Sequence, residues 1–420
     1  TEENGVQPQP VYVMAADDDV VEGPHAGTLT HSAASADEDY DGIVISNVVV
    51  QIADNDGTLL ATFDNGTLTV TDRDPVGKPN QLTVTRNAAE LVISDASEQF
   101  DEPAPAGALL SNDNRMLTIP LSSVSALAIG LAAGNDALTV DFSGGNPIPA
   151  DGLSFEGGAG TDRLALAGGS ATNLSFGFTN AHDGSVAVDG QTISYTGLEP
   201  IASDIQATHV TLDYSTTDET ITVQQDGGDT AKTLVTSTLP PSGESVSFTN
   251  PTGTLTINAG DTGNDIVDVN SFGTSNGGAP GALAIAGGSG TDDVNVNAGI
   301  SLGGSNALSI AAETIDVGAV TVSTANGNQS YVGALSLAGA TLQTTGTGSV
   351  ILGGNVTVSG SAASSIQGKL NLGSVGGQRT FSVADVTGTS ATDLDVTAAV
   401  SNGGIVKSGT GTMRLGGDNS

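Results

Sequence analysis

The stretch Gly152–Gly169 reads GLSFEGGAGTDRLALAGG, and Gly281–Gly299 repeats its plan as GALAIAGGSGTDDVNVNAG. Each copy has a glycine-rich turn, an aspartate and then alternating apolar residues, which is the pattern of a tight turn leading into a short strand. Shorter passages precede both copies: GNDALTVDFSGG begins at Gly134, and GNDIVDVN begins at Gly263. This self-similarity predicts an architecture of stacked strands in which each repeat packs on the next.

Two pairs of aspartates keep the copies in register. Asp136 corresponds to Asp265, and Asp162 corresponds to Asp292, with an almost constant offset across a segment of different sequence. All four passages are similar to the calcium-binding nonapeptide Gly-Gly-x-Gly-x-Asp-x-apolar-x, in which neighbouring turns share one ion. Within each copy, however, the two aspartates are much further apart than one nonapeptide. This spacing favours aspartates that cap the turns of successive rungs, with calcium as the alternative.

The glycines before these aspartates predict the backbone geometry of the turns. We expect Gly160 and Gly290 to adopt positive φ at a corner of the rung, where a Cβ would be strained. We expect Asp162 and Asp292 to accept hydrogen bonds from the backbone amides of the turn.

Composition restricts both the fold and the partners. The chain has 420 residues with 58 glycines, no cysteine, no tryptophan and only 3% aromatic residues, so its apolar side chains are mainly Val, Ile, Leu and Ala. Such residues suit narrow stacked strands. The 47 acidic residues outnumber the 10 basic ones and give a net charge of −37. This charge disfavours nucleic acid and anionic membranes and favours divalent cations, while a saline habitat would explain it without any ligand.

The pattern along the chain predicts an all-β protein. No 3.6-residue period is sustained, and short alternating runs are separated by Gly, Asn and Asp, which favours a right-handed parallel β-helix or β-solenoid with a partial β-sandwich at the N-terminus. We expect four units: a partial sandwich at 1–58, two copies of a β-repeat region at 59–200 and 201–320, and a neutral solenoid at 321–420. The sequence contains no run of 18 apolar residues, so we expect no membrane span in it. Its start, TEENGVQPQP, is polar, so we expect no signal peptide there. Both ends are expected to be cuts in a longer chain.

Acidic residues cluster in the first unit. The passages AADDDVVEGPHAGTLTHSAASADEDYDGI and VVVQIADNDG resemble the C-terminal half of Calx-β-type repeats, which are sandwich modules of exported and adhesive proteins. The resemblance implies a truncated sandwich whose clustered oxygen ligands bind calcium, and a solvated acidic turn is the alternative. The acids that it places at calcium sites or at the domain junction are Asp17, Asp18, Asp19, Glu22, Asp54 and Asp56.

The C-terminal part carries two further resemblances. Gly403–Ser420, GGIVKSGTGTMRLGGDNS, resembles the autotransporter-associated β-strand repeat found in the passenger regions of large bacterial surface proteins. Gly327–Leu337, GNQSYVGALSL, is similar to strands of haemagglutinin-type surface β-helices. Together these resemblances imply an exported protein that is located at the cell surface or outside the cell.

No motif for catalysis stands out. Polysaccharide lyases and glycosidases also use β-helices, but they need paired acids in a cleft or an acid cluster beside a base. Asp72-Arg73-Asp74 is the nearest candidate, and a salt bridge within the turn explains it as well. The four histidines lack the spacing of metal ligands; they are His25, His31, His182 and His209.

The expected function is therefore structural and adhesive rather than enzymatic. We expect an extended stalk whose partners are other cells, extracellular matrix or polysaccharide surfaces, with calcium as the one expected cofactor. The alternatives are a β-helical carbohydrate-active enzyme and a calcium-dependent component of a surface layer.

Overall fold

The computed structural model describes residues 10–13, 25–52, 57–74, 77–214, 218–238, 245–373 and 375–417. About half of the chain is strand (51%), so the prediction of an all-β protein is confirmed. The helical elements of the described residues are two short 3-10 turns, η1 (Leu121–Ser123) and η2 (Ser275–Gly277). Neither these nor any other helix in the described ranges has the length and apolarity needed to cross a membrane.

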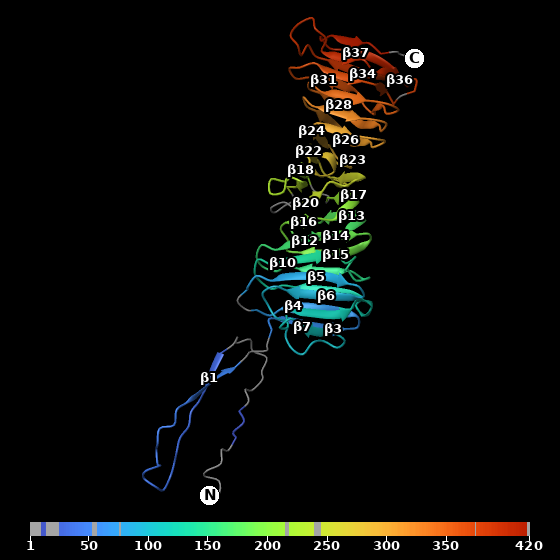
Figure 1. Cartoon of the computed structure of the whole chain (residues 1–420). Coiled ribbons are helices and arrows are strands. Elements are labelled where there is room, and N and C mark those ends of the chain that lie inside the picture. The colour runs from blue at the N-terminus through green and yellow to red at the C-terminus, as the bar shows by residue number, and fades with distance from the viewer. Residues whose placement is uncertain are drawn as a thin grey trace.

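Two strands near the N-terminus form a small sheet of their own. Strands β1 (His25–Leu29) and β2 (Val48–Ile52) pair in antiparallel register. Their side chains are mostly exposed, including Val49 at 61%. Figure 1 shows this pair outside the main stack, in which strands follow one another from β3 at one end to β37 at the other.

The first part of the stack combines antiparallel hairpins with parallel neighbours. Its strands are β3 (Leu59–Asp64), β4 (Thr67–Asp72), β5 (Gln81–Asn87), β6 (Glu90–Asp95), β7 (Leu109–Ser111), β8 (Met116–Pro120), β9 (Ala126–Gly130), β10 (Ala137–Asp141), β11 (Leu153–Glu156) and β12 (Arg163–Ala167). The β3–β4 and β5–β6 pairs are antiparallel, whereas β4–β9–β11 and β5–β10–β12 are parallel. The β3–β4 hairpin forms because Asn65 and Gly66 both take positive φ, as a two-residue type I′ turn requires.

The middle part follows the same plan. Its strands are β13 (Ser170–Phe178), β14 (Gly184–Val188), β15 (Gln191–Thr196), β16 (Ile201–Ser203), β17 (Gln206–Asp213), β18 (Thr220–Gln225), β19 (Lys232–Thr236), β20 (Ser245–Thr249), β21 (Thr254–Asn258), β22 (Ile266–Val269), β23 (Ala282–Ala286) and β24 (Asp293–Val296). The β13–β14–β15 and β18–β19–β20 meanders are antiparallel. The ladders β13–β17–β21–β23 and β18–β22–β24 are parallel.

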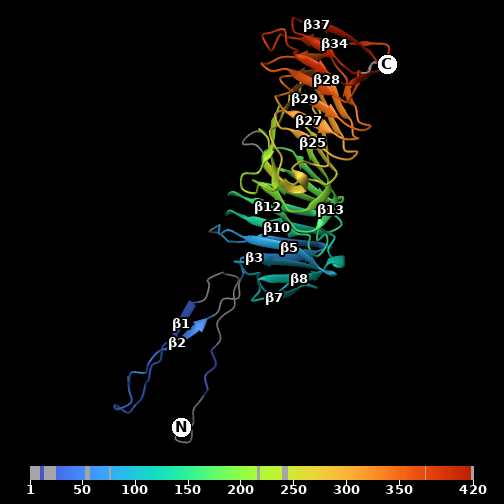
Figure 2. The same ribbon diagram turned by 45° about the horizontal axis from the view of Figure 1, so that its top comes forward.

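In the last part every strand pairing of the described residues is parallel. Its strands are β25 (Ile300–Leu302), β26 (Leu308–Val317), β27 (Thr321–Thr324), β28 (Gln329–Leu337), β29 (Thr341–Thr344), β30 (Val350–Leu352), β31 (Val356–Val358), β32 (Ser364–Gln367), β33 (Lys369–Asn371), β34 (Gln378–Val383), β35 (Leu394–Val396), β36 (Ala399–Ser401), β37 (Gly404–Ser408) and β38 (Met413–Leu415). Leu308 pairs with Gln329, and Gln329 pairs with Val350, so the register advances by the same number of residues at these two steps; the next steps differ in length, because Val350 pairs with Leu370 and Leu370 pairs with Val400. We call the strands that lie between one residue and its partner in the next parallel strand a layer. Figure 2 shows β25, β27 and β29 of three layers one above another.

The core consists of inward side chains stacked from layer to layer. Strand residues alternate between buried and partly exposed, because successive side chains of a strand point to opposite faces. One buried column runs through five parallel strands; its members are Leu82, Leu138, Leu164, Ile201 and Val246. Each apolar side chain therefore loses its contact with water only when the neighbouring layers are in place.

One pair of polar side chains in the core of the last part is fully hydrogen-bonded. Gln329 and Tyr331 are both fully buried. The Tyr331 hydroxyl donates to Oε1 of Gln329 (3.0 Å), and Nε2 of Gln329 donates to the carbonyls of Val322 (3.1 Å) and Gln343 (2.7 Å). These bonds offset the cost of removing the amide and the hydroxyl from water.

Candidate functional site

The acids predicted to bind calcium lie outside the residues that the structure describes; they are Asp17, Asp18, Asp19, Glu22, Asp54 and Asp56. Their role stays a prediction. Within the described ranges, no group of three or more His, Asp or Glu is placed to hold a metal ion. The unusual polar feature of this part of the chain is a row of buried carboxylates at the repeated Gly–Asp turns.

The first row joins three layers near the start of the stack. Asp136 and Asp162 are each at most 1% exposed. The amide of Asn80 donates to Oδ1 of Asp136 (2.7 Å), and the amide of Asp136 donates to Oδ1 of Asp162 (2.7 Å). Each carboxylate therefore accepts the amide of the layer before it. We call Asn80, Asp136 and Asp162 the first carboxylate ladder.

The second copy of the repeat builds a longer row. The amide of Glu219 donates to Oδ1 of Asp265 (2.9 Å), and the amide of Asp265 donates to Oδ1 of Asp292 (2.9 Å). The amide of Asp292 in turn donates to Oε2 of Glu313 (3.0 Å). These four residues form the second carboxylate ladder.

The ladders correct the expected role of Asp162 and Asp292. Both were expected to bind amides of their own turns, but their Oδ1 atoms bind the amides of Asp136 and Asp265 in the preceding layer. The reason is the parallel register, which places each turn directly beside the equivalent turn of the next layer. The carboxylates thus connect layers instead of closing single turns.

The glycines of the motif are required by the same close stacking. Gly160 and Gly290 have φ of 147° and 150°, which confirms the predicted positive φ. A Cβ on either would lie 1.4 or 1.5 Å from a carbonyl oxygen of the preceding layer. Gly157 and Gly287 face the side chains of their aspartates, where a Cβ would lie within 2.7 Å of the aspartate Cβ. Steric contact therefore explains the Gly-Gly-x-Gly-x-Asp pattern without a bound ion.

Three members of the ladders lie outside the predicted Gly–Asp turns, namely Asn80, Glu219 and Glu313. A shared pattern identifies the first two: a polar residue is followed by alternating apolar residues, as in Asn80-Gln-Leu-Thr-Val and Glu219-Thr-Ile-Thr-Val. Asp136-Ala-Leu-Thr-Val has the same form. The Gly–Asp turn does not identify these residues, because the ladder position can also hold Asn or Glu without that turn.

Each ladder aspartate has one satisfied and one orphaned oxygen. The Oδ2 atoms of Asp136, Asp162, Asp265 and Asp292 are buried and have no hydrogen-bond partner among the described residues. Asp393 provides the contrast, because its two oxygens accept three amides, those of Val386, Thr387 and Thr412. These amides lower the pKa of Asp393.

Burial makes the ladder carboxyls weak acids. Burial, together with the negative charges of Asp162, Asp72 and Asp95, raises the pKa of Asp136 to about 6. The hydrogen bond from the Asn80 amide lowers this pKa but does not cancel the effect of burial. The pKa of Asp265 is likewise raised to about 6 by burial, together with the charges of Asp292 and Asp218. Burial also raises the pKa values of Asp162 and Asp292. The carboxyls of Asp136 and Asp265 can thus take up a proton at about pH 6.

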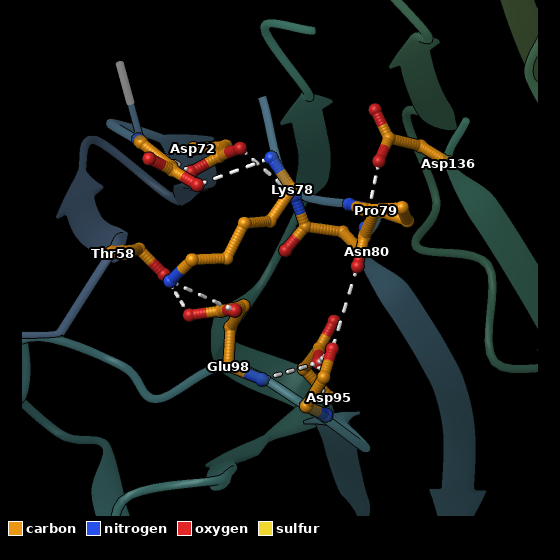
Figure 3. Close-up of polar contacts among 10 residues, drawn as sticks. Thr58, Asp72, Lys78, Pro79, Asn80, Asp95, Glu98 and Asp136 are labelled. Carbon is orange, nitrogen blue, oxygen red and sulfur yellow. Dashed lines mark hydrogen bonds and ion pairs between the residues drawn. The ribbon is translucent and has the colours of Figure 1, made fainter. Parts of the chain in front are cut away.

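A polar cluster lies at the N-terminal end of the first ladder (Figure 3). Nδ2 of Asn80 donates to Oδ2 of Asp72 (2.9 Å), while Asp95 accepts the amides of Gln81 (2.8 Å) and Glu98 (2.8 Å). Nζ of Lys78 lies 3.6 Å from Oε1 of Glu98. Burial raises the pKa of Asp72 here. The cluster connects strands β4, β5 and β6 where the stack begins.

Arg73 forms its salt bridge outside the Asp72-Arg73-Asp74 turn. Nη2 of Arg73 pairs with Oδ2 of Asp101 (2.5 Å) and donates to the carbonyl of Gly57 (3.2 Å). Asp72 accepts the Asp74 amide instead (2.8 Å). Arg73 therefore ties the end of β4 to the 57–58 and 100–101 segments.

The histidines are dispersed. His25 and His31 are exposed at and beyond the ends of β1. Nδ1 of His182 lies 2.6 Å from Oε1 of Glu199, and Nδ1 of His209 accepts the amide of Thr254 (3.3 Å). Both contacts connect neighbouring loops or layers.

Three hollows on the surface differ in chemistry. One of 390 Å³ lies on the outer face of β4, β9, β11 and β15 and has Thr and Ser rows with a single acid, Glu156. A second, of 280 Å³, contains two acids and an aromatic ring, Asp213, Asp261 and Tyr214. A third, of 510 Å³, contains Arg86 and no acid.

Comparisons with known proteins identify no relative, because no family model, no curated protein and no solved structure matches this chain.

Substituting the corner glycines is expected to destabilise the stack. Gly160→Val or Gly290→Val places a Cβ against a backbone carbonyl and forces an unfavourable φ, which costs more than about 1 kcal/mol of unfolding free energy. Thermal melts followed by circular dichroism measure this loss. Gly227→Val is the matched control, because Gly227 is exposed and a Cβ there meets no atom within 4 Å. Equal melting temperatures for Gly160→Val and Gly227→Val would contradict the corner assignment.

Replacing Asp136 by Asn is expected to flatten the pH dependence of stability. The pKa of Asp136 rises from 3.8 to about 6 on folding, so the folded chain binds the proton more tightly. Its contribution to stability is complete below about pH 3.8 and is lost as the pH rises through about 6. Asn cannot ionise and keeps an oxygen for the Asn80 amide. The melting temperature should therefore fall less between about pH 4 and about pH 7.5 in Asp136→Asn than in the parent chain.

Asp113→Asn is the control for this comparison, since it removes one charge at an exposed position. It should leave the pH profile of the parent unchanged. Parallel profiles for all three proteins would mean that the ladder carboxyl does not titrate in this range.

Proposed function

We propose that this chain is a segment of a right-handed β-solenoid stalk in a large exported bacterial surface protein, with a structural and adhesive role. The observation that carries the proposal is the parallel register of the last part of the chain, which advances by the same step from Leu308 to Gln329 and again to Val350. The bond between the Ser349 amide and Asn328, which joins two of these layers, spans 21 residues. Repeats of about 20 to 45 residues whose units contact only their neighbours are typical of solenoids.

Two further features support a stalk. The stack grows along one direction with the chain, so every added layer lengthens it by about 4.8 Å. A net charge of −37 keeps such a strand-rich surface soluble by self-repulsion. The resemblances to Calx-β-type and autotransporter-associated repeats favour a location at the cell surface, where the partners would be other cells, matrix or polysaccharides.

A carbohydrate-active enzyme is the second candidate, and one observation favours it. The 280 Å³ hollow at the ends of β17 and β21 contains Asp213, Asp261 and Tyr214, an acid pair with an aromatic ring. Asp213 already accepts a hydrogen bond from Nδ2 of Asn258 (2.5 Å). Polysaccharide cleavage by the parent chain that is lost in Asp213→Asn and Asp261→Asn would replace the stalk proposal.

Removal of one whole layer is expected to leave a folded chain. Deleting residues 329–349 removes β28 and β29 and brings Leu308 into register with Val350, so the ladders on either side can rejoin. We expect a strand-type circular dichroism spectrum and a cooperative melt with a modest fall in melting temperature, because a solenoid loses only one interface.

Deletion of residues 329–338 alone is the control. It removes β28 but keeps β29, so the remaining part of the layer no longer fills the position between β26 and the strands β30 and β31, and we expect loss of the cooperative melt. An equal fall in melting temperature for both deletions would contradict a solenoid. In a solenoid only the deletion that matches one layer lets the neighbouring layers pair again, whereas in a single indivisible core both deletions would disrupt the fold.

Calcium is a separate prediction for the first unit. If Asp17, Asp18, Asp19 and the other predicted acids hold ions, EDTA should lower the melting temperature of the unit 1–58, since a ligand that binds only the folded state stabilises it. The neutral region 321–420 should not respond. An unchanged melting temperature with EDTA at moderate salt would mean that these acids bind no calcium and serve only to keep the chain soluble.

A further inference from the structure

The 510 Å³ hollow is formed by three segments from different layers. The end of strand β5 contributes Arg86, the η1 segment contributes Ser122, Ser123 and Val124, and the loop between β10 and β11 contributes Ile148 and Pro149. Its volume lies within the range of sites for small ligands, about 300 to 1,000 Å³.

The walls of the hollow are held by hydrogen bonds between side chains and the backbone. Oδ1 of Asn146 accepts the Ile148 amide (3.0 Å), and Nδ2 of Asn146 donates to the Val188 carbonyl (3.3 Å). Nε2 of Gln191 donates to the Ile148 carbonyl (3.1 Å). The loop that carries Ile148 is therefore fixed to two other strands, so the hollow is preorganised.

The floor and the rim differ in polarity. Val124, Ile148 and Pro149 are buried beneath the hollow, and the apolar part of its open lining comes from the half-buried Leu121 and the exposed Ala150. Ser122 and Ser123 are exposed and place two hydroxyl groups at the rim. A ligand with an apolar face and polar edges, such as a sugar ring, matches this arrangement.

Charge distinguishes this hollow from the rest of the surface. Its lining includes no Asp or Glu, although the chain has 47 of them. Arg86 donates through Nε to the Ala88 carbonyl (2.8 Å), and no carboxylate of the described residues lies within ion-pair distance of it. Its terminal guanidinium nitrogens are thus available to an anion, and guanidinium binds carboxylates with two parallel hydrogen bonds.

We propose that this hollow binds a carboxylate-bearing sugar, a uronate residue of an acidic polysaccharide. The carboxylate lies on Arg86, the ring packs on Leu121 and Ala150, and the hydroxyls of Ser122 and Ser123 bind the ring hydroxyls. This inference rests on the adhesive role proposed above and names the class of its ligand. A hollow without acids disfavours cations, and its single guanidinium disfavours longer phosphate chains.

The test is a calorimetric titration of the full chain with a trimer of galacturonate. We expect saturable binding by the parent and at least about tenfold weaker binding by Arg86→Gln, the loss of a charged hydrogen-bonding partner. Ala150→Glu, an exposed change at the edge of the hollow, should weaken binding similarly by repulsion. Arg115→Gln, at an arginine outside the hollow, should bind like the parent.

The neutral methyl ester of the same trimer is the ligand control and should bind much more weakly. Equal binding of ester and acid, undiminished binding by Arg86→Gln, or no binding by the parent would each overturn the uronate proposal. Circular dichroism melts of the same samples verify that the variants are folded. A negative result would leave the stalk proposal intact, because the whole-layer deletion tests that proposal independently of any ligand.

Discussion

The structure depends on giving every buried turn amide an acceptor. Turns stacked between layers exclude water, so an unpaired amide there would cost free energy comparable to a lost hydrogen bond. At the Gly–Asp corners the carboxylate of the next layer supplies that acceptor, as Asp162 does for Asp136. The glycines of the motif keep neighbouring layers close enough for this bond. One constraint thus explains the residue types at these corners, given the parallel register.

The carboxylates that satisfy these amides also bring a cost. Each leaves a second oxygen without a partner among the described residues, and burial makes the charged form unfavourable. The last part of the chain uses asparagine for similar contacts: Oδ1 of Asn328 accepts the Ser349 amide (3.0 Å), and Oδ1 of Asn355 accepts the Thr380 amide (2.9 Å). An amide side chain provides the acceptor without a charge. The acidic ladders therefore couple the stability of the first two copies to pH, while the asparagine contacts do not.

The stacking of layers also determines where hollows form on the surface. Outward positions of parallel strands form rows, so a hollow arises where small residues follow one another or where loops of different layers meet. The Arg86 hollow belongs to the second kind, because its walls come from a hairpin turn, a 3-10 turn and a loop. Ligand recognition in such a protein is expected at irregular connections, since regular rungs present repeated and nearly uniform side chains.

Much of the fold could be predicted from the sequence because alternation of period two and glycine-rich turns are local properties. They determine the all-β class, the strands after Asp162 and Asp292, and the positive φ of Gly160. Which strands become neighbours is decided only by the tertiary structure. The Asn80–Asp136 bond spans 56 residues, the Glu219–Asp265 bond spans 46, and antiparallel meanders of varied length separate these partners. The sequence by itself identified the aspartates as important turn residues; only the stacking of layers decided that they bind the preceding layer and that their second oxygens are buried.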